Sequence, residues 1–202
     1  MLVRFMMLQA LAFTPLAHGS GAADLLISLL NNIESLSASY EQAGQATSQR
    51  GQFWLSRRDR FRLTAVAPVS QIIVSDGENL WTHDLDLEQV IITRLSDEAA
   101  NIPLLLFAGH PAKLKDTYNI EQFEDENLQH FVLSPLDKTS AIGIVALSFA
   151  NNLPLRLAFQ TAMQQRTVIH FHNVSAAPVD AALFDFQLPD NIDVIDDRPG
   201  SD

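Results

Sequence analysis

Most of the chain alternates between apolar and polar residues with a period of two, which is typical of β-strands that bury one face. The alternation begins near Ser37 and continues, with one interruption, as far as His172. It predicts eleven strands, at Ser37–Gln42, Gln52–Arg57, Arg60–Ala65, Gln71–Ser75, Leu80–Asp84, Gln89–Arg94, Tyr118–Phe123, Leu128–Leu133, Ile142–Phe149, Leu155–Thr161 and Arg166–His172. The links between neighbouring strands are short, so we expect consecutive strands to pair antiparallel.

Two segments have a helical pattern instead. In Asp24–Leu36 the leucine and isoleucine residues recur every three or four positions, and Asp24 stands where an N-cap belongs. The second segment, Ile102–Ala108, interrupts the strands, with Pro103 suited to a first helical turn and Gly109 to a helix end. Because this short helix has no polar face, it needs apolar cover all round, from the core alone or from the core and an apolar ligand.

The stretch from Val74 to Val90 is expected to form a hairpin, because Asp76-Gly77 is a strong turn signal. Leu80 and Trp81 should then face opposite sides of the sheet, and the acidic residues that follow should form the rim of a loop. This places the stretch in a structural role.

The strand Ile142–Phe149 is apolar at both sets of alternating positions. A sheet with one solvated face would show polar residues at one set, so the pattern predicts cover on each side. A single antiparallel sheet of about eleven strands must also curl. The sequence thus predicts a curled, unclosed sheet closed by helices, with an apolar space inside.

The first residues have the pattern of an export signal. Arg4 is the only charged residue before Asp24, and an apolar run lies between them, too short to span a membrane. Small residues follow, so we expect cleavage between Ala17 and Asp24. Residues 1–22 are taken as the signal peptide and residues 23–202 as one exported domain.

Composition narrows the choice of function further. The 202 residues are 47% hydrophobic, which suffices for one substantial core, and the net charge of −11 disfavours nucleic acid as a partner. There is no cysteine, so disulfides are excluded and the core alone must stabilise an exported domain.

The motifs that would support chemistry or metal binding are incomplete in this sequence. The acidic residues at 84, 86 and 88 resemble the start of a calcium loop, but Gln89 and Leu95 stand where an EF-hand needs glycine and glutamate. His170 and His172 share a strand face without the further ligands that zinc requires. No nucleophile elbow, phosphate loop or HExxH motif occurs, so we predict no enzyme, no metal and no cofactor, although a Ser-His-Asp set assembled in space stays open.

Four segments, taken in order, resemble the periplasmic outer-membrane lipoprotein carrier family, LolA. They are Gly51-Gln52-Phe53-Trp54-Leu55-Ser56-Arg57 through Phe61-Arg62; SDGENLW with the acidic residues and Val90 after it; the helix Asn101–Phe107; and Val179-Asp180-Ala181-Ala182-Leu183-Phe184-Asp185-Phe186 with Pro189 and Val194. The resemblance covers nearly all of the chain that follows the predicted signal peptide. It implies an unclosed β-barrel with a helical lid over an apolar cavity.

The resemblance also implies partners and residue roles. Such carriers take acylated lipoproteins from an inner-membrane ABC transporter complex and pass them to an outer-membrane lipoprotein receptor. Arg57 would latch the lid by bonding backbone carbonyls of the lid helix, beside Phe107, and Phe61 would contact the transporter or the cargo. Arg58 follows Arg57 where the family usually has proline. The residues expected to line the cavity are Phe53, Leu55, Leu104, Leu105, Val145, Leu147 and Phe149.

Three other interpretations stay open at the level of sequence. The family's receptor, LolB, shares the fold type but is normally a lipoprotein anchored through an N-terminal cysteine, which this chain lacks. A periplasmic regulatory module that senses lipoproteins or lipids would use the same half-barrel, usually with a further C-terminal domain. A lipid hydrolase is the third. We expect a monomer, because a carrier needs the mouth of its cavity free.

Overall fold

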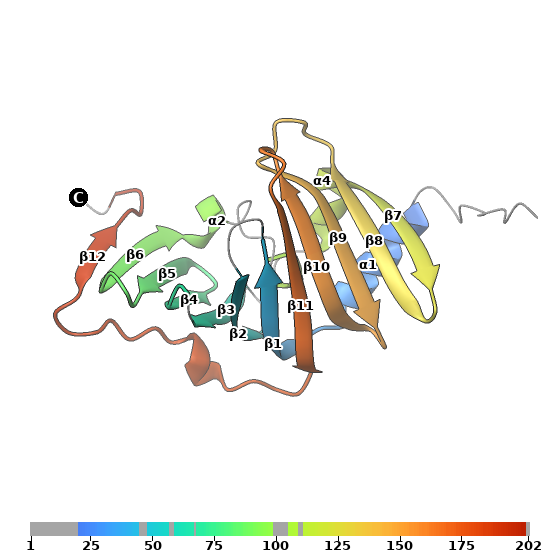
Figure 1. Cartoon of the computed structure of the whole chain (residues 1–202). Coiled ribbons are helices and arrows are strands. Elements are labelled where there is room, and N and C mark those ends of the chain that lie inside the picture. Colours follow the sequence, from blue (N-terminus) through green and yellow to red (C-terminus); the bar gives the residue numbers. More distant parts are fainter. Residues whose placement is uncertain are drawn as a thin grey trace, which may run out of the picture.

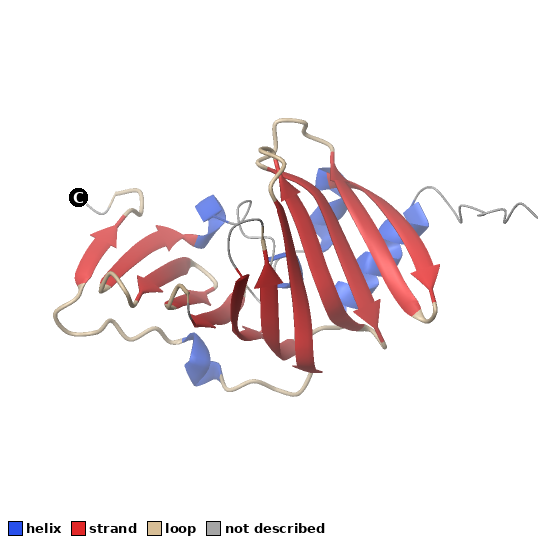
Figure 2. Ribbon diagram, viewed as in Figure 1, coloured by secondary structure: helices blue, strands red, loops and turns tan. Residues whose placement is uncertain are grey.

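A single sheet of twelve strands is the framework of the protein (Figures 1 and 2). The computed structural model describes residues 20–44, 48–56, 59–66, 68–98, 105–108 and 111–200. The strands are β1 (Ser35–Ala43), β2 (Ser48–Ser56), β3 (Arg60–Val66), β4 (Gln71–Asp76), β5 (Asn79–Asp84), β6 (Gln89–Arg94), β7 (Tyr118–Asp125), β8 (Leu128–Pro135), β9 (Ile142–Ala150), β10 (Leu153–Thr161), β11 (Arg166–Ser175) and β12 (Asp193–Asp196).

The strands lie across the sheet in the order β12-β6-β5-β4-β3-β2-β1-β11-β10-β9-β8-β7. Each strand pairing is antiparallel except that of β12 with β6, which is parallel. The sheet curls without closing, so that β7–β11 form one wall and β2–β6 the other (Figure 1). The predicted fold class, one curled and unclosed antiparallel sheet, is confirmed, and all eleven predicted strands are present.

Helix α1 (Ser20–Asn31) covers the face of the sheet that we call the inner face. Leu26, Leu30 and Ile33 are buried against the sheet residues of the main core. The predicted helix, Asp24–Leu36, was wrong at both ends. Asp24 lies inside the helix and pairs with Lys115, while Leu36 belongs to β1.

The C-terminal end of the helix was misplaced because the helical pattern and the strand pattern overlap at Leu36. Leu36 lies three residues after Ile33 and so continues the helical stripe, but it also begins the alternation Leu36, Ala38, Tyr40 that β1 buries. Strand pairing with β2 along the whole of β1 decides between the two patterns.

Between β6 and β7 the chain forms only short helices: α2 (Leu95–Glu98), α3 (Leu105–Ala108), η2 (Pro111–Lys113) and α4 (Leu114–Thr117). The predicted lid helix, Ile102–Ala108, is represented by the four residues of α3, and residues 99–104 lie outside the described residues. In Figure 2 these helices lie on the same side of the sheet as α1.

The C-terminal part of the chain crosses the opposite, outer face as a strap, residues 176–192, which contains η3 (Ala181–Phe184). Arg62 of β3 donates a hydrogen bond to the carbonyl oxygen of Leu183 at 3.3 Å, and the ring of Phe186 stacks on Trp81 at 5.8 Å. Phe184, 1% exposed, and Val74, 0% exposed, are buried on this side. The strap therefore builds a second, smaller core on the outer face of β3–β6.

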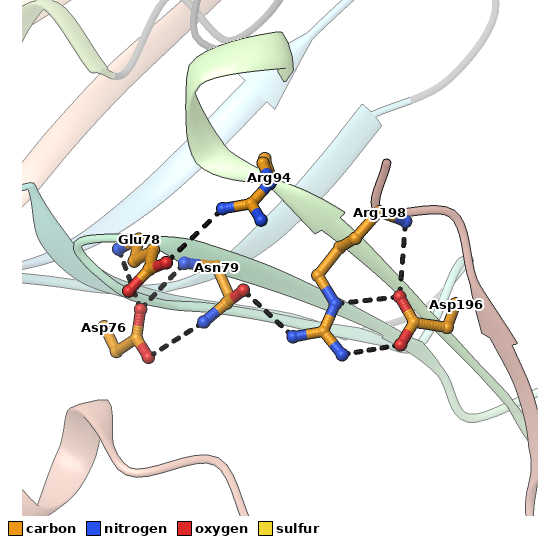
Figure 3. A network of polar contacts seen from close by, with 6 residues as sticks. All are labelled: Asp76, Glu78, Asn79, Arg94, Asp196 and Arg198. Atoms are coloured by element: carbon orange, nitrogen blue, oxygen red, sulfur yellow. Dashed lines mark hydrogen bonds and ion pairs between the residues drawn. The ribbon is translucent and has the colours of Figure 1, made fainter. Parts of the chain in front are cut away.

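Strand β12 was missing from the predicted strands, because its four residues are too few to show alternation and two of them are acidic. A polar network holds its end to the turn between β4 and β5 (Figure 3). Arg198 donates to Asp196 through Nε at 2.8 Å and through Nη2 at 2.5 Å, and to Asn79 through Nη1 at 3.2 Å. These hydrogen bonds lower the pKa of the Asp196 carboxyl and raise that of the Arg198 guanidinium.

The hairpin predicted for residues 74–90 is present, with Gly77 at a φ of 102° in its turn. Leu80 is buried on the inner face and Trp81 lies on the outer face, as expected. The acidic rim is structural. Asp84 Oδ1 accepts hydrogen bonds from the backbone N–H groups of Asp86 and Leu87, both at 2.9 Å, and Asp86 Oδ2 accepts one from Ser70 at 3.0 Å.

One expectation about β9 was wrong. Its apolar residues do not have cover on both sides, because Ile144, on the outer face, is 50% exposed. The outer face of β9 is therefore partly open: Ser148 is 5% exposed and contacts His130, whereas Ile144 lies in solvent.

Candidate lipid-binding face

The inner face of the sheet is lined by apolar side chains in register across neighbouring strands. Leu36, Leu55 and Phe61 lie opposite one another on β1, β2 and β3, and the row continues to Leu80 of β5. Each of these four side chains is at most 3% exposed. Alternation places them all on one face, because strand side chains repeat every two residues.

The other wall supplies larger side chains. Val145, Leu147 and Phe149 of β9 are 0–1% exposed, and Leu147 lies opposite both Phe131 of β8 and Leu157 of β10. They join the side chains of the first wall and of α1 in one hydrophobic cluster. The curl of the sheet thus brings both walls to a common apolar interior.

Helix α3 inserts Phe107 into this interior. The Phe107 ring is 4% exposed and meets Phe171 edge to face at a centroid distance of 5.7 Å and Phe149 at 6.4 Å. Phe149 in turn meets Phe131 at 5.9 Å. Such pairs contribute roughly 0.5–1.5 kcal/mol each beyond burial of their area. A single side chain from a four-residue helix therefore occupies the centre of the apolar face.

Five of the predicted cavity residues lie where the sequence placed them, on the inner face: Phe53, Leu55, Val145, Leu147 and Phe149. All are 0–1% exposed, so in this structure protein side chains fill the space around them. Leu105 belongs to α3, and Leu104 and Arg57 lie outside the described residues. The latch and lining roles remain predictions.

Phe61 was expected to contact the transporter or the cargo. It is 2% exposed on β3, opposite Leu55 and Ser75. A contact with a transporter or cargo through its ring therefore requires the inner face to open first. That role also stays a prediction.

Several interior residues of the strands were not singled out from the sequence: Tyr40, Phe131, Leu157, Ile169 and Phe171. A signal for the strand residues existed, because each stands at the buried set of alternating positions. Which wall faces which was not predictable, because it depends on the curl of the sheet.

Tyr40 carries a polar group into the apolar interior, where the residue is 3% exposed. Burial raises the pKa of its phenol to about 12, and the hydroxyl points to the carbonyl oxygen of Thr64 at 3.5 Å. Burial also raises the pKa of Tyr118. These are the two tyrosines of the chain.

Phenolate absorbance should report this burial directly. We expect neither tyrosine of the folded protein to titrate at the usual value of about 10. In a Tyr118→Phe variant the remaining phenol should titrate near pH 12. Between about pH 10 and pH 12 the unfolded chain releases the Tyr40 proton and the folded chain retains it, so the free energy of unfolding falls as the pH rises. In a Tyr40→Phe variant, this contribution to the fall in the free energy of unfolding should be absent. Titration near pH 10 in a folded Tyr118→Phe protein would contradict the burial.

The described residues contain no group of three or more histidine, aspartate or glutamate side chains that could hold a metal ion. None of the described helices is long and apolar enough to cross a membrane. What the inner face offers is apolar surface around Phe107, with few polar groups, among them the hydroxyls of Tyr40 and Ser75. It suits acyl chains better than a polar substrate.

Comparison with known sequences decides the family. Residues 31–187 match the sequence model of the outer membrane lipoprotein carrier protein LolA. The chain belongs to the LolA family. The outer-membrane lipoprotein carrier protein of Pseudomonas paraeruginosa is 35% identical, over 96% of this chain and 98% of the relative. That of Chromohalobacter salexigens is 32% identical over 87% of each.

Solved structures show the same fold at much lower identity. An uncharacterised conserved protein from Thermus thermophilus has a TM-score of 0.58 at 11% identity, over 86% of this chain and 98% of that chain. A crystal structure of MucB has a TM-score of 0.56 at 16% identity, over 84% of this chain and 64% of that chain. The curled sheet of this LolA-family chain is thus shared with proteins of distant sequence.

Proposed function

We propose that this protein is a periplasmic carrier that binds the acyl chains of lipoproteins on its inner face and does no covalent chemistry. It receives acylated lipoproteins from an inner-membrane ABC transporter complex and delivers them to an outer-membrane lipoprotein receptor. Membership of the LolA family supports acylated lipoproteins as the cargo. The observation that carries the proposal is the insertion of Phe107 into the apolar interior from a helix of only four residues.

The energetics of release explain why such a lid is useful. Each buried CH₂ group contributes roughly 0.8 kcal/mol, so several complete acyl chains in an empty apolar pocket would dissociate very slowly. If the acyl chains must displace Phe107, the lost burial of its ring offsets part of the binding energy. The carrier then holds its cargo firmly enough for transport and loosely enough for delivery.

In this mechanism Arg57 holds the lid closed through its guanidinium donors, which suit the free carbonyl groups at the end of a helix. Phe61 becomes accessible when the lid lifts, and contacts the transporter or the cargo at that stage. Phe53, Leu55, Val145, Leu147 and Phe149 contact the acyl chains, together with Leu104 and Leu105 from the lid segment.

The test is a release assay. Purified protein is incubated with spheroplasts of the source cell, and the supernatant is tested for acylated lipoprotein in a soluble complex with it. We expect release by this protein, and none by buffer or by an unrelated acidic protein of similar size.

A known carrier serves as the positive control for the transporter. If that carrier releases lipoprotein and this protein does not, the carrier proposal is wrong. The same inner face would then serve a regulatory module that senses lipids or lipoproteins.

A further inference from the structure

The hydroxyl of Tyr40 is a buried polar group with a weak hydrogen bond. Tyr40 is 3% exposed on β1, within the cluster that forms the apolar interior. Its hydroxyl lies 3.5 Å from the carbonyl oxygen of Thr64, and within the described residues this is its one hydrogen bond. Hydroxyl donors usually lie about 2.8 Å from their acceptors, so a bond of this length is weak. A buried hydroxyl that is poorly bonded destabilises the fold, and its presence therefore calls for an explanation.

Gly51 makes room for the ring of Tyr40. The two residues are cross-strand neighbours on β1 and β2. A Cβ atom on Gly51 would lie 2.9 Å from Cε1 of Tyr40 and 1.7 Å from the carbonyl oxygen of Thr64. A glycine within a strand often marks such a close approach. The ring therefore leans across β2 toward β3 and carries its hydroxyl along the inner face.

The strand order places Tyr40 beside the lid helix. Helix α3 contacts β2, and its Phe107 ring meets Phe171 of β11 at a centroid distance of 5.7 Å. Strand β1 lies between β2 and β11, and Tyr40 is the β1 residue directly opposite Phe171. The Cβ atoms of such cross-strand neighbours are about 4.5–5.5 Å apart. Displacement of Phe107 would therefore open the space next to Tyr40.

An acyl chain brings a polar group with it, because it begins at an ester or amide carbonyl. Burial of that carbonyl without a hydrogen-bond donor is unfavourable. Among the described residues, the inner face has two buried hydroxyls, those of Tyr40 and Ser75. The Ser75 oxygen accepts a hydrogen bond from the backbone N–H of Gly77 at 3.1 Å, which ties it to the turn between β4 and β5. Tyr40 borders the space that Phe107 fills, so it is the donor better placed for an acyl carbonyl.

The phenol of Tyr40 also remains a donor under ordinary conditions. Burial raises its pKa to about 12, so the hydroxyl keeps its proton at neutral pH. The acceptor that it has in the structure, the Thr64 carbonyl, is held only weakly. Exchange of that bond for one of usual length would favour a ligand with a carbonyl at this position.

We propose that the Tyr40 hydroxyl donates a hydrogen bond to an ester or amide carbonyl of the bound acyl chain and so fixes how deep the chain enters the interior. This inference deepens the proposed carrier function and rests on it. A ligand with the same hydrocarbon and no carbonyl gains nothing from the exchange of partners. Tyr40 is thus a specificity-determining residue, which favours acyl chains over plain alkyl chains.

The test compares two ligands that differ only in their carbonyl groups, dioctanoylglycerol and its dioctyl ether analogue. Each ligand displaces a fluorescent fatty-acid probe whose own affinity is measured for every variant. We expect Tyr40→Phe to weaken binding of the ester about fivefold relative to the ether, the factor that one neutral hydrogen bond usually contributes. The ratio of the two affinities cancels a general change of the pocket, because such a change affects both ligands.

Infrared spectroscopy gives a second readout, which a purely structural role of Tyr40 would not change. A hydrogen bond lowers the stretching frequency of a carbonyl group. With the ester isotopically labelled at its carbonyl carbons, a band shifted to lower wavenumber should be present with the unchanged protein and absent with Tyr40→Phe. Tyr118→Phe is the matched control, because it removes the same hydroxyl from β7, the last strand of the sheet on that side. It should leave the affinity ratio and the band unchanged.

The possible failures can be told apart. If both ligands bind and Tyr40→Phe leaves their ratio unchanged, the role of Tyr40 is wrong and the carrier function is unaffected. The role is also wrong if the bound ester shows no shifted band in the unchanged protein, or if Tyr118→Phe lowers the ratio equally. If the unchanged protein binds neither ligand, the carrier function fails and this inference falls with it.

Discussion

Replacement of Phe107 by alanine is expected to weaken the fold and to strengthen acyl binding at the same time. The ring is 4% exposed between Phe149 and Phe171, and its removal should lower the free energy of unfolding by up to about 3–5 kcal/mol. Under the proposed mechanism, the same removal vacates apolar space and ends the competition between lid and cargo. Affinity for a fluorescent fatty-acid probe should therefore rise by about tenfold or more, the equivalent of a buried aromatic side chain that need not be displaced.

Phe184 provides the matched control. It is equally large and 1% exposed, but η3 places it on the outer face, beneath the strap. Phe184→Ala should lower the stability to urea by a similar amount and leave affinity for the probe unchanged. Equal or weaker probe binding by Phe107→Ala would contradict the view that Phe107 competes with acyl chains. A parallel gain in Phe184→Ala would point to general loosening of the fold.

The two phenylalanines also show what the sequence could and could not predict. The segment around Phe107 was recognised as a short helix without a polar face, and its need for cover was clear from pattern alone. Its actual neighbours are Phe149 of β9 and Phe171 of β11. They lie 42 and 64 residues after Phe107 in the chain. No local pattern specifies such pairs, because they depend on how far the sheet curls.

The strands themselves were predictable because the physics that forms them is local. Alternation, the Asp76-Gly77 turn and short links sufficed to define eleven strands in antiparallel order. The prediction failed where two patterns overlapped, at Leu36, and where an element was too short to have a period, at β12. The strap was visible only as a set of family residues around Phe184, and its position on the outer face follows from contacts with β3 and β4.

Gly51 of β2 is not expected to tolerate a side chain. A Cβ atom there would lie 1.7 Å from the carbonyl oxygen of Thr64 and 2.9 Å from Cε1 of Tyr40. Neither contact can be relieved by rotation of a flexible side chain, because the first partner is backbone and the second is a ring that is 3% exposed. A glycine within a strand marks such a close approach of another chain segment.

We therefore expect Gly51→Ala to lower the free energy of unfolding by about 3 kcal/mol or more, the upper end of the usual cost of overpacking. The yield of folded protein should fall as well. Gly143→Ala, the same change on β9, is the control. Its Cβ would lie 3.0 Å from the carbonyl oxygen of Gln160, and a shift of a few tenths of an ångström would relieve that contact. Urea denaturation of both variants gives the comparison. Equal midpoints would show that β2 and β3 can separate at Gly51 without loss. A selective loss at Gly51 would show that the close approach of Thr64 and Tyr40 to β2 is required for the stability of the sheet.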